Sequence, residues 1–155
     1  MGLFGKKRDQ QQPVLGPVTV ERLLAVCREA GLQVEAMTTG DYLVEYNGLQ
    51  IVVAHAQDHV ALGTYVLAGE GENYSSAFSV ANDWVIEHNN GNNGPVAFIT
   101  EQAFEGAMRV VVHCEYRILD GLELTDAQFR DEVLYGLDGV ARGIYRFVEF
   151  RDSRM

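Results

Sequence analysis

A helical pattern near the middle of the chain separates two groups of predicted strands and carries the only tryptophan. Its apolar face is formed by residues at helical spacing, with Phe78 at the edge: Tyr74, Ala77, Ala81, Trp84, Val85 and His88. The run Asn89-Asn90-Gly91-Asn92-Asn93-Gly94-Pro95 follows and predicts the end of this helix. A single helix between two blocks of strands disfavours a fold in which every strand is followed by a helix.

Short strands are predicted before this helix, over residues 34–38, 42–46, 49–56 and 60–67. Asn47-Gly48 between the second and third of them predicts a two-residue hairpin turn, because both positions require positive φ angles. The strand over residues 49–56 is apolar on both sides, which is typical of a strand inside a sheet.

Two longer strands are predicted after the helix, over residues 96–101 and 108–118, joined by residues 103–106. The second strand alternates between an apolar and a polar side. The apolar side is expected to be buried and consists of Met108, Val110, Val112, Cys114, Tyr116 and Ile118. This alternation indicates an antiparallel sheet with one buried and one wet face.

Helices are also predicted at both ends of the folded region. Thr19 is the expected N-cap of the first, which Gly31 ends, and Thr125 with Gln128 forms a capping box before the last. The last helix has an apolar stripe: Phe129, Val133, Leu137, Val140, Ile144 and Phe147. The expected fold is α+β: a twisted antiparallel sheet with helices packed against it, in the order helix, three or four strands, helix, two strands, helix.

The length of 155 residues and the hydrophobic content of 47% suit one compact domain, expected over residues 17–150. Residues 1–16 are predicted to be a disordered basic tail, and residues 151–155 a flexible C-terminus. The net charge is −10; Lys6, Lys7, Arg8 and Asp9 give the tail +2, so the remainder carries −12. Such an acidic body would repel a phosphate backbone, and we expect no nucleic-acid partner.

Cys27 and Cys114 both lie on predicted apolar faces, and neither belongs to a CxxC or zinc-finger pattern. Buried free thiols are expected, which is consistent with a cytoplasmic location. No apolar run approaches the roughly 20 residues of a membrane span. No phosphate loop, nucleophile elbow or metalloprotease motif is present, so we expect neither an enzyme nor a bound cofactor.

Three glycines of the last helix, Gly136, Gly139 and Gly143, fall on one side of it. One interpretation is a close approach of another element, inside the fold or across a dimer. The other is that the helix is kinked or broken there. Asn82, Trp84 and Ile86 of the central helix are further candidates for an interaction surface, although the apolar neighbours of Trp84 favour a core position.

Histidines offer the remaining candidates for chemistry. His113 lies beside Arg109 and Arg117 on the polar side of its strand and could titrate near neutral pH. A solvated ladder of polar side chains is the simpler interpretation. His55, Asp58 and His59 lie close in sequence near a strand end, but a straight strand would hold positions i and i+4 about 13 Å apart, which disfavours a shared metal.

The helix containing Ala81-Asn82-Asp83-Trp84 resembles that of the YbjN-like family, described as bacterial sensory-transduction regulators. Family members show Asn-x-Trp at this place, then a strand pair, a turn like Gly121-Leu122-Glu123-Leu124-Thr125-Asp126-Ala127-Gln128-Phe129, and a long last helix. The resemblance covers residues 18–148. The family often has a second asparagine where this chain has Val85, so the role of that asparagine does not carry over.

The resemblance implies a fold similar to type III secretion chaperones, which are small, acidic and often dimeric and bind extended protein segments without catalysis. The expected function is therefore regulatory or chaperone-like binding of a protein partner, with a homodimer as the expected state. The alternative is a small-ligand sensor or enzyme with a pocket between sheet and helices near Arg109, His113 and Arg117. A third hypothesis is an inert accessory domain.

Overall fold

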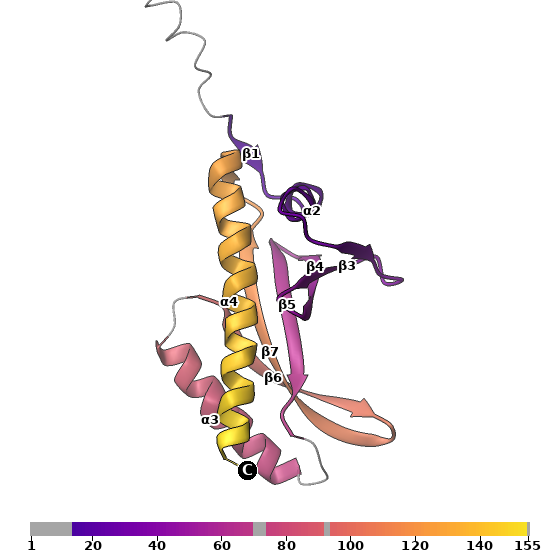
Figure 1. The fold of residues 1–155 in the computed structure, drawn as a ribbon, viewed down its shortest axis with the longest axis vertical. Helices are drawn as coiled ribbons and strands as arrows, with labels where there is room; N and C mark the ends of the chain where they lie inside the picture. Colours follow the sequence, from indigo (N-terminus) through magenta and orange to yellow (C-terminus); the bar gives the residue numbers. More distant parts are fainter. Residues whose placement is uncertain (1–13, 70–73, 92–93, 155) are drawn as a thin grey trace, which may run out of the picture.

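The computed structural model describes residues 14–69, 74–91 and 94–154, and it has the expected α+β class. Its main sheet has six antiparallel strands in the spatial order β2-β3-β4-β5-β7-β6 (Figure 1). Their bounds are β2 (Val34–Ala36), β3 (Tyr42–Tyr46), β4 (Leu49–Ala56), β5 (His59–Leu67), β6 (Val96–Phe104) and β7 (Ala107–Leu119). Two short strands, β1 (Gly16–Pro17) and β8 (Glu123–Leu124), pair with each other.

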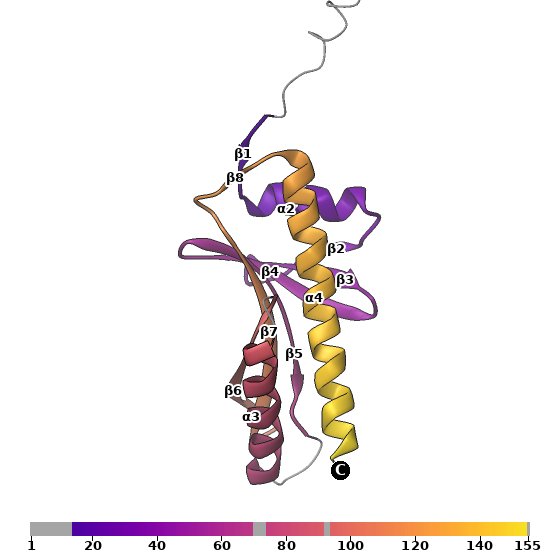
Figure 2. The same ribbon diagram turned by 90° about the vertical axis from the view of Figure 1, so that its left-hand side faces the viewer.

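Three helices pack on one side of this sheet: α2 (Val20–Glu29), α3 (Tyr74–Gly91) and α4 (Asp126–Ser153). α4 runs along β5 and β7, and α2 lies beside its N-terminal half (Figure 2). α3 packs against β6, β7 and α4. No described helix covers the opposite face of the sheet, which we call the open face.

The capping and turn signals in the sequence are confirmed. The Thr19 hydroxyl accepts a hydrogen bond from the amide of Arg22 and caps α2. Thr125 and Gln128 form the reciprocal capping box of α4. Asn47 and Gly48 have φ angles of 49° and 78°, and β4 lies between β3 and β5 inside the sheet.

The hairpin of β6 and β7 is longer than the sequence pattern indicated. Residues 103 and 104 belong to β6, and the turn consists only of Glu105 and Gly106, with φ angles of 50° and 80°. β5 ends opposite Val111, so the hairpin beyond this point has no third strand and projects from the body (Figure 1). The prediction missed this because Glu105 is not a residue type that favours positive φ.

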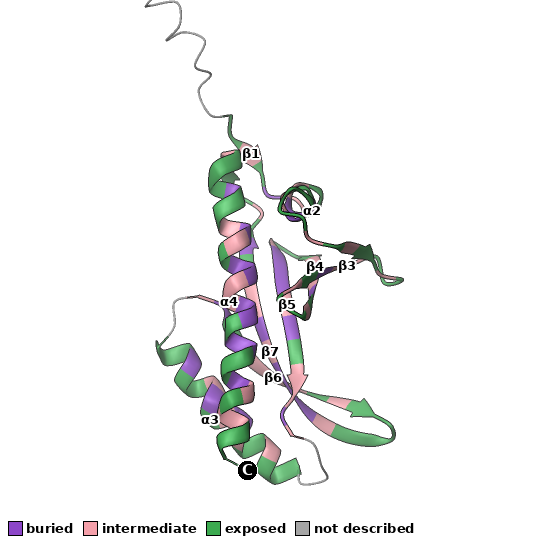
Figure 3. Cartoon of the chain, viewed as in Figure 1, coloured by how far each residue is buried: buried purple, intermediate pink, exposed green. Residues whose placement is uncertain are grey.

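The core lies between the helices and the sheet, and α4 is buried along the side that faces the sheet (Figure 3). The apolar alternation of β7 is correct for Val110, Val112, Cys114 and Ile118, but Met108 is exposed because it lies on the projecting hairpin. Both cysteines are buried free thiols. Burial raises the pKa of Cys27 to about 11 and that of Cys114 to about 12, so neither is a reactive thiolate.

At both ends of the chain, the described residues differ from the predicted flexible segments. Most of the predicted tail lies outside the described residues, but Gly16 belongs to β1. At the other end α4 continues to Ser153, and Arg151 donates a hydrogen bond to the carbonyl oxygen of Leu67. Residues 151–153 are therefore helical, because Arg151 attaches the last turn to the end of β5.

The glycines of α4 serve a close approach inside the fold, and the helix is continuous. A Cβ atom at Gly136 would lie 2.5 Å from Tyr116 and 2.9 Å from Leu62. At Gly139 it would lie 2.8 Å from Pro95, and at Gly143 it would lie 2.9 Å from the sulfur of Cys114. Of the two interpretations, the close approach is confirmed and it lies inside the fold, so these three positions face the sheet and the segment preceding β6 and not a partner.

Candidate functional site

Trp84 belongs to the core and is not available to a partner. Only 6% of its surface is exposed. Its ring stacks on His88 with 4.6 Å between centroids and meets Phe147 edge-on at 5.3 Å. His88 is itself buried, and its Nε2 donates to the carbonyl oxygen of Pro95. The interface role considered for Trp84 was wrong, and the core interpretation is correct.

The other two candidates on α3 lie nearer the surface. Asn82 is half-buried, and Ile86 has 53% of its surface exposed. Tyr74 and Phe78 are also exposed by 39% and 40%, and their rings stack at 6.2 Å. The flank of α3 that borders β6 is therefore partly apolar and accessible.

β6 is an edge strand, and Asn89 of α3 already occupies one position along that edge. The Asn89 side-chain amide donates to the carbonyl oxygen of Ala97 and accepts from its N–H, both at 2.9 Å. A neighbouring strand would make the same pair of hydrogen bonds with its backbone. The backbone groups of Ala97 thus point away from β7, toward the outside of the sheet.

In an antiparallel strand, the backbone N–H and C=O groups of alternate residues point to the same side of the strand. Ile99, Glu101 and Ala103 have the same parity as Ala97, so their N–H and C=O groups also point outward. Within the described part of the chain, none of these backbone groups has a hydrogen-bond partner. Tyr74 donates to the carboxylate of Glu101, which places the start of α3 beside this edge. We call this edge, with Tyr74, Phe78 and Ile86, the α3–β6 shoulder.

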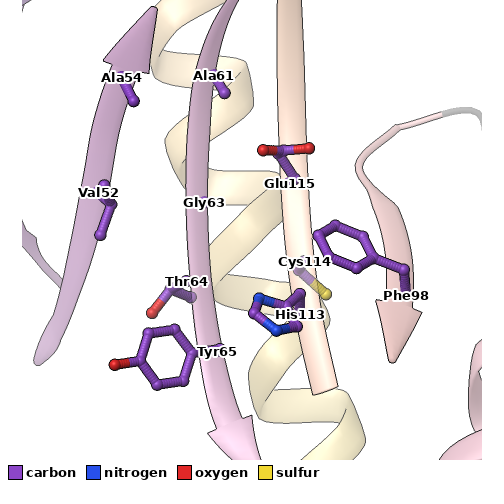
Figure 4. A pocket seen from close by; sticks show the side chains of 10 residues that line it. All are labelled: Val52, Ala54, Ala61, Gly63, Thr64, Tyr65, Phe98, His113, Cys114 and Glu115. Carbon is purple, nitrogen blue, oxygen red and sulfur yellow. The ribbon is translucent and has the colours of Figure 1, made fainter. Parts of the chain in front are cut away.

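The open face holds a second candidate, a hollow of about 150 Å³ above Gly63 (Figure 4). Its floor and one side carry small side chains, Ala54 and Ala61, beside Val52. The other side is a row of rings across three strands, from Tyr65 through His113 to Phe98. Ring centroids are 5.5 Å apart for Tyr65 and His113, and 4.6 Å apart for His113 and Phe98.

His113 is held within this row by its neighbours. Its Nε2 lies 2.7 Å from the hydroxyl of Thr100, and Phe98 stacks on its ring at an interplanar angle of 4°. Burial lowers the pKa of His113, and the nearby carboxylate of Glu115 opposes this effect. The imidazole is therefore neutral at physiological pH. A neutral imidazole can donate one hydrogen bond and accept another.

The hollow that His113 lines is not the pocket expected between sheet and helices near Arg109, His113 and Arg117. The hollow lies on the open face, with α4 behind the sheet, and not between sheet and helices (Figure 4). Neither arginine lines it; Arg117 instead binds Glu115 at 2.7 Å. Of the three residues only His113 lines this hollow.

The remaining histidines do not come together. His55 binds Asp120 at 2.9 Å, and His59 binds Asp58 at 3.0 Å. Among the residues that the structure describes, no three His, Cys, Asp or Glu side chains could share a metal. In the same ranges, no helix is long and apolar enough to cross a membrane.

The chain matches no protein-family model, and no curated protein matches its sequence. The resemblance to the YbjN-like family therefore stays a prediction.

Sequence reasoning missed Asn89 and Gly63, the two residues that define these sites. Asn89 was included in the run that breaks the helix, and nothing in that run shows which amide reaches a strand. Gly63 lies within a predicted strand, where an isolated glycine indicates a bulge or a close approach to the backbone. That signal was present in the sequence.

Proposed function

We propose that this chain is a non-enzymatic, regulatory or chaperone-like protein-binding domain of the YbjN-like type, active in the cytoplasm. It binds an extended segment of a protein partner along the outer edge of β6. The observation that carries the proposal is the Asn89 amide, which bonds Ala97 as a neighbouring strand would. Strand addition uses such an edge, because backbone hydrogen bonds give affinity and alternate side chains give specificity.

The proposed strand addition leads to expectations for the bound segment. We expect it to begin beyond Asn89 and to pair with Ile99, Glu101 and Ala103, whose backbone groups point away from β7. A basic residue near Glu101 is favoured, since the acidic side chain is exposed and the body of the chain carries −12. Apolar side chains on the helix side of the segment would contact Tyr74 and Phe78. The segment is thus a short strand with alternating apolar residues and a lysine or arginine.

A proline at Ala103 is expected to weaken binding of such a segment at least tenfold without unfolding the chain. The Ala103 N–H points outward, so proline removes a donor for the partner but none of the bonds to β7. The probe is a library of random twelve-residue peptides displayed on phage, selected on the folded chain. We expect the selected peptides to bind Ala103→Pro at least tenfold more weakly by titration calorimetry.

Ala103→Val is the matched control, because it changes the same side chain and keeps the N–H. It should bind the selected peptides as the native chain does. The proposal fails if the library gives no binder, or if Ala103→Pro binds as tightly as Ala103→Val while both remain folded by circular dichroism.

The homodimer implied by the resemblance would use the same shoulder. Self-pairing of β6 centred on Glu101 would bring two carboxylates together, which is unfavourable. A dimer is therefore expected to rely on Phe78 and Ile86. Light scattering measures the oligomeric state, because a monomer has a mass of 17.2 kDa and a dimer twice that.

A further inference from the structure

The backbone at Gly63 does not require a glycine, so the presence of glycine there calls for another reason, and the hollow above it offers one. It lies inside β5, between β4 and β7, and its φ angle is one that other residues adopt readily. A Cβ atom there would approach the carbonyl oxygen of Cys114 and the side chain of Glu115 at 3.5–3.6 Å, an ordinary contact. Glycine in a strand interior is less stable than alanine by roughly 0.5–1 kcal/mol.

The hollow has the shape and chemistry of a small ligand site. A hollow of about 150 Å³, lined mostly by apolar side chains and open to solvent on one side, is large enough for one benzene-sized ring. Tyr65 and Phe98 offer ring edges and faces for contact with a second aromatic group. Since the small floor residues Ala54 and Ala61 leave the backbone of β5 accessible, a flat molecule can approach it closely.

His113 provides the polar contact within this hollow. Nε2 is held by Thr100, and the other ring nitrogen points toward β5 at the hollow (Figure 4). That Nδ1 has no hydrogen-bond partner among the described residues. An anion is disfavoured there, because the carboxylate of Glu115 lines the same hollow and the body is strongly acidic.

We propose that the hollow over Gly63 binds an uncharged, single-ring aromatic molecule with one hydrogen-bonding group at its edge, which pairs with His113. The ring packs over the backbone of Gly63 and against Tyr65. This site is on the open face and is separate from the outer edge of β6, so either proposal can fail while the other stands.

Titration with phenol, followed by amide resonances in two-dimensional NMR, tests the proposal. Phenol is expected to shift the amides of Gly63 and His113 and to saturate at millimolar concentration. Cyclohexanol, which lacks the aromatic ring, and benzoate, which is an anion, are expected to bind at least tenfold more weakly. Equal shifts with benzoate or cyclohexanol, or the absence of shifts at Gly63, would overturn it.

Gly63→Val fills the hollow and should weaken phenol binding at least tenfold while raising the melting temperature. Gly63→Ala is a milder second variant, since its Cβ makes only ordinary contacts. Ala107→Val is the matched control: it lies on the same side of β7 as His113 but on the exposed hairpin. Undiminished phenol binding in a folded Gly63→Val, or equal loss in Ala107→Val, contradicts a site at this hollow.

Discussion

Replacing Trp84 by alanine is expected to lower the free energy of unfolding by about 3–5 kcal/mol, the usual effect of removing a large aromatic side chain from a core. The indole stacks on His88 and contacts Phe147, and it joins α3 to α4. Its removal leaves a cavity between two helices that also cover the sheet. Urea unfolding followed by circular dichroism measures the effect.

Ile86→Ala is the control for this change, two residues away on the same helix. Ile86 has 53% of its surface exposed, so its truncation should change the free energy of unfolding by at most about 0.5 kcal/mol. It should, however, weaken association at the α3–β6 shoulder. If Trp84→Ala remained as stable as the native chain while losing a partner, Trp84 would be an interface residue and the core assignment would be wrong.

Gly136→Ala is expected to destabilise the chain by about 1–3 kcal/mol, although alanine is the better helix former. The added Cβ would lie 2.5 Å from Cδ2 of Tyr116 and 2.9 Å from Cδ1 of Leu62. Tyr116 cannot move away easily, because its hydroxyl donates to the carboxylate of Glu132. The steric term therefore exceeds the gain of roughly 1 kcal/mol in helix propensity. Thermal unfolding should show a lower midpoint.

Gly91→Ala gives the opposite sign and serves as the control. Gly91 is the last residue of α3, and a Cβ atom there would contact nothing within 4 Å. The Gly91→Ala variant should be at least as stable as the native chain. A stabilised Gly136→Ala would show that α4 does not approach the sheet as closely as described, and that the glycine side of the helix is free for another partner.

The parts of the fold that depend on local chemistry were predictable from the sequence. Thr19, the Thr125–Gln128 box and Asn47-Gly48 each act within a few residues, so their short-range signals were sufficient. The apolar periods of α4 and β7 likewise gave their buried sides. These signals suffice for the α+β class.

Sites that depend on tertiary arrangement were not predictable in the same way. Whether the α4 glycines faced a partner or the sheet could be decided only by the position of Tyr116 and Cys114. The long-range hydrogen bonds of Arg22 could not be predicted from the sequence either. Its guanidinium donates to the carbonyl oxygens of Pro17 in β1 and Leu124 in β8, segments about a hundred residues apart in the sequence. The polar side of β7 was assigned correctly for His113, but the hollow that its ring lines with Tyr65 and Phe98 depends on three strands and was not predictable.

Amide hydrogen exchange along β6, measured by NMR with and without a phage-selected peptide, tests whether a partner segment adds a strand to this edge. In the free monomer, the amides of Ile99, Glu101 and Ala103 should exchange quickly, while Thr100 and Gln102, bonded to β7, exchange slowly. Adding the peptide should protect the three outward amides. If the peptide binds and those amides continue to exchange as fast as before, the partner does not add a strand to β6 and the proposed binding mode is wrong.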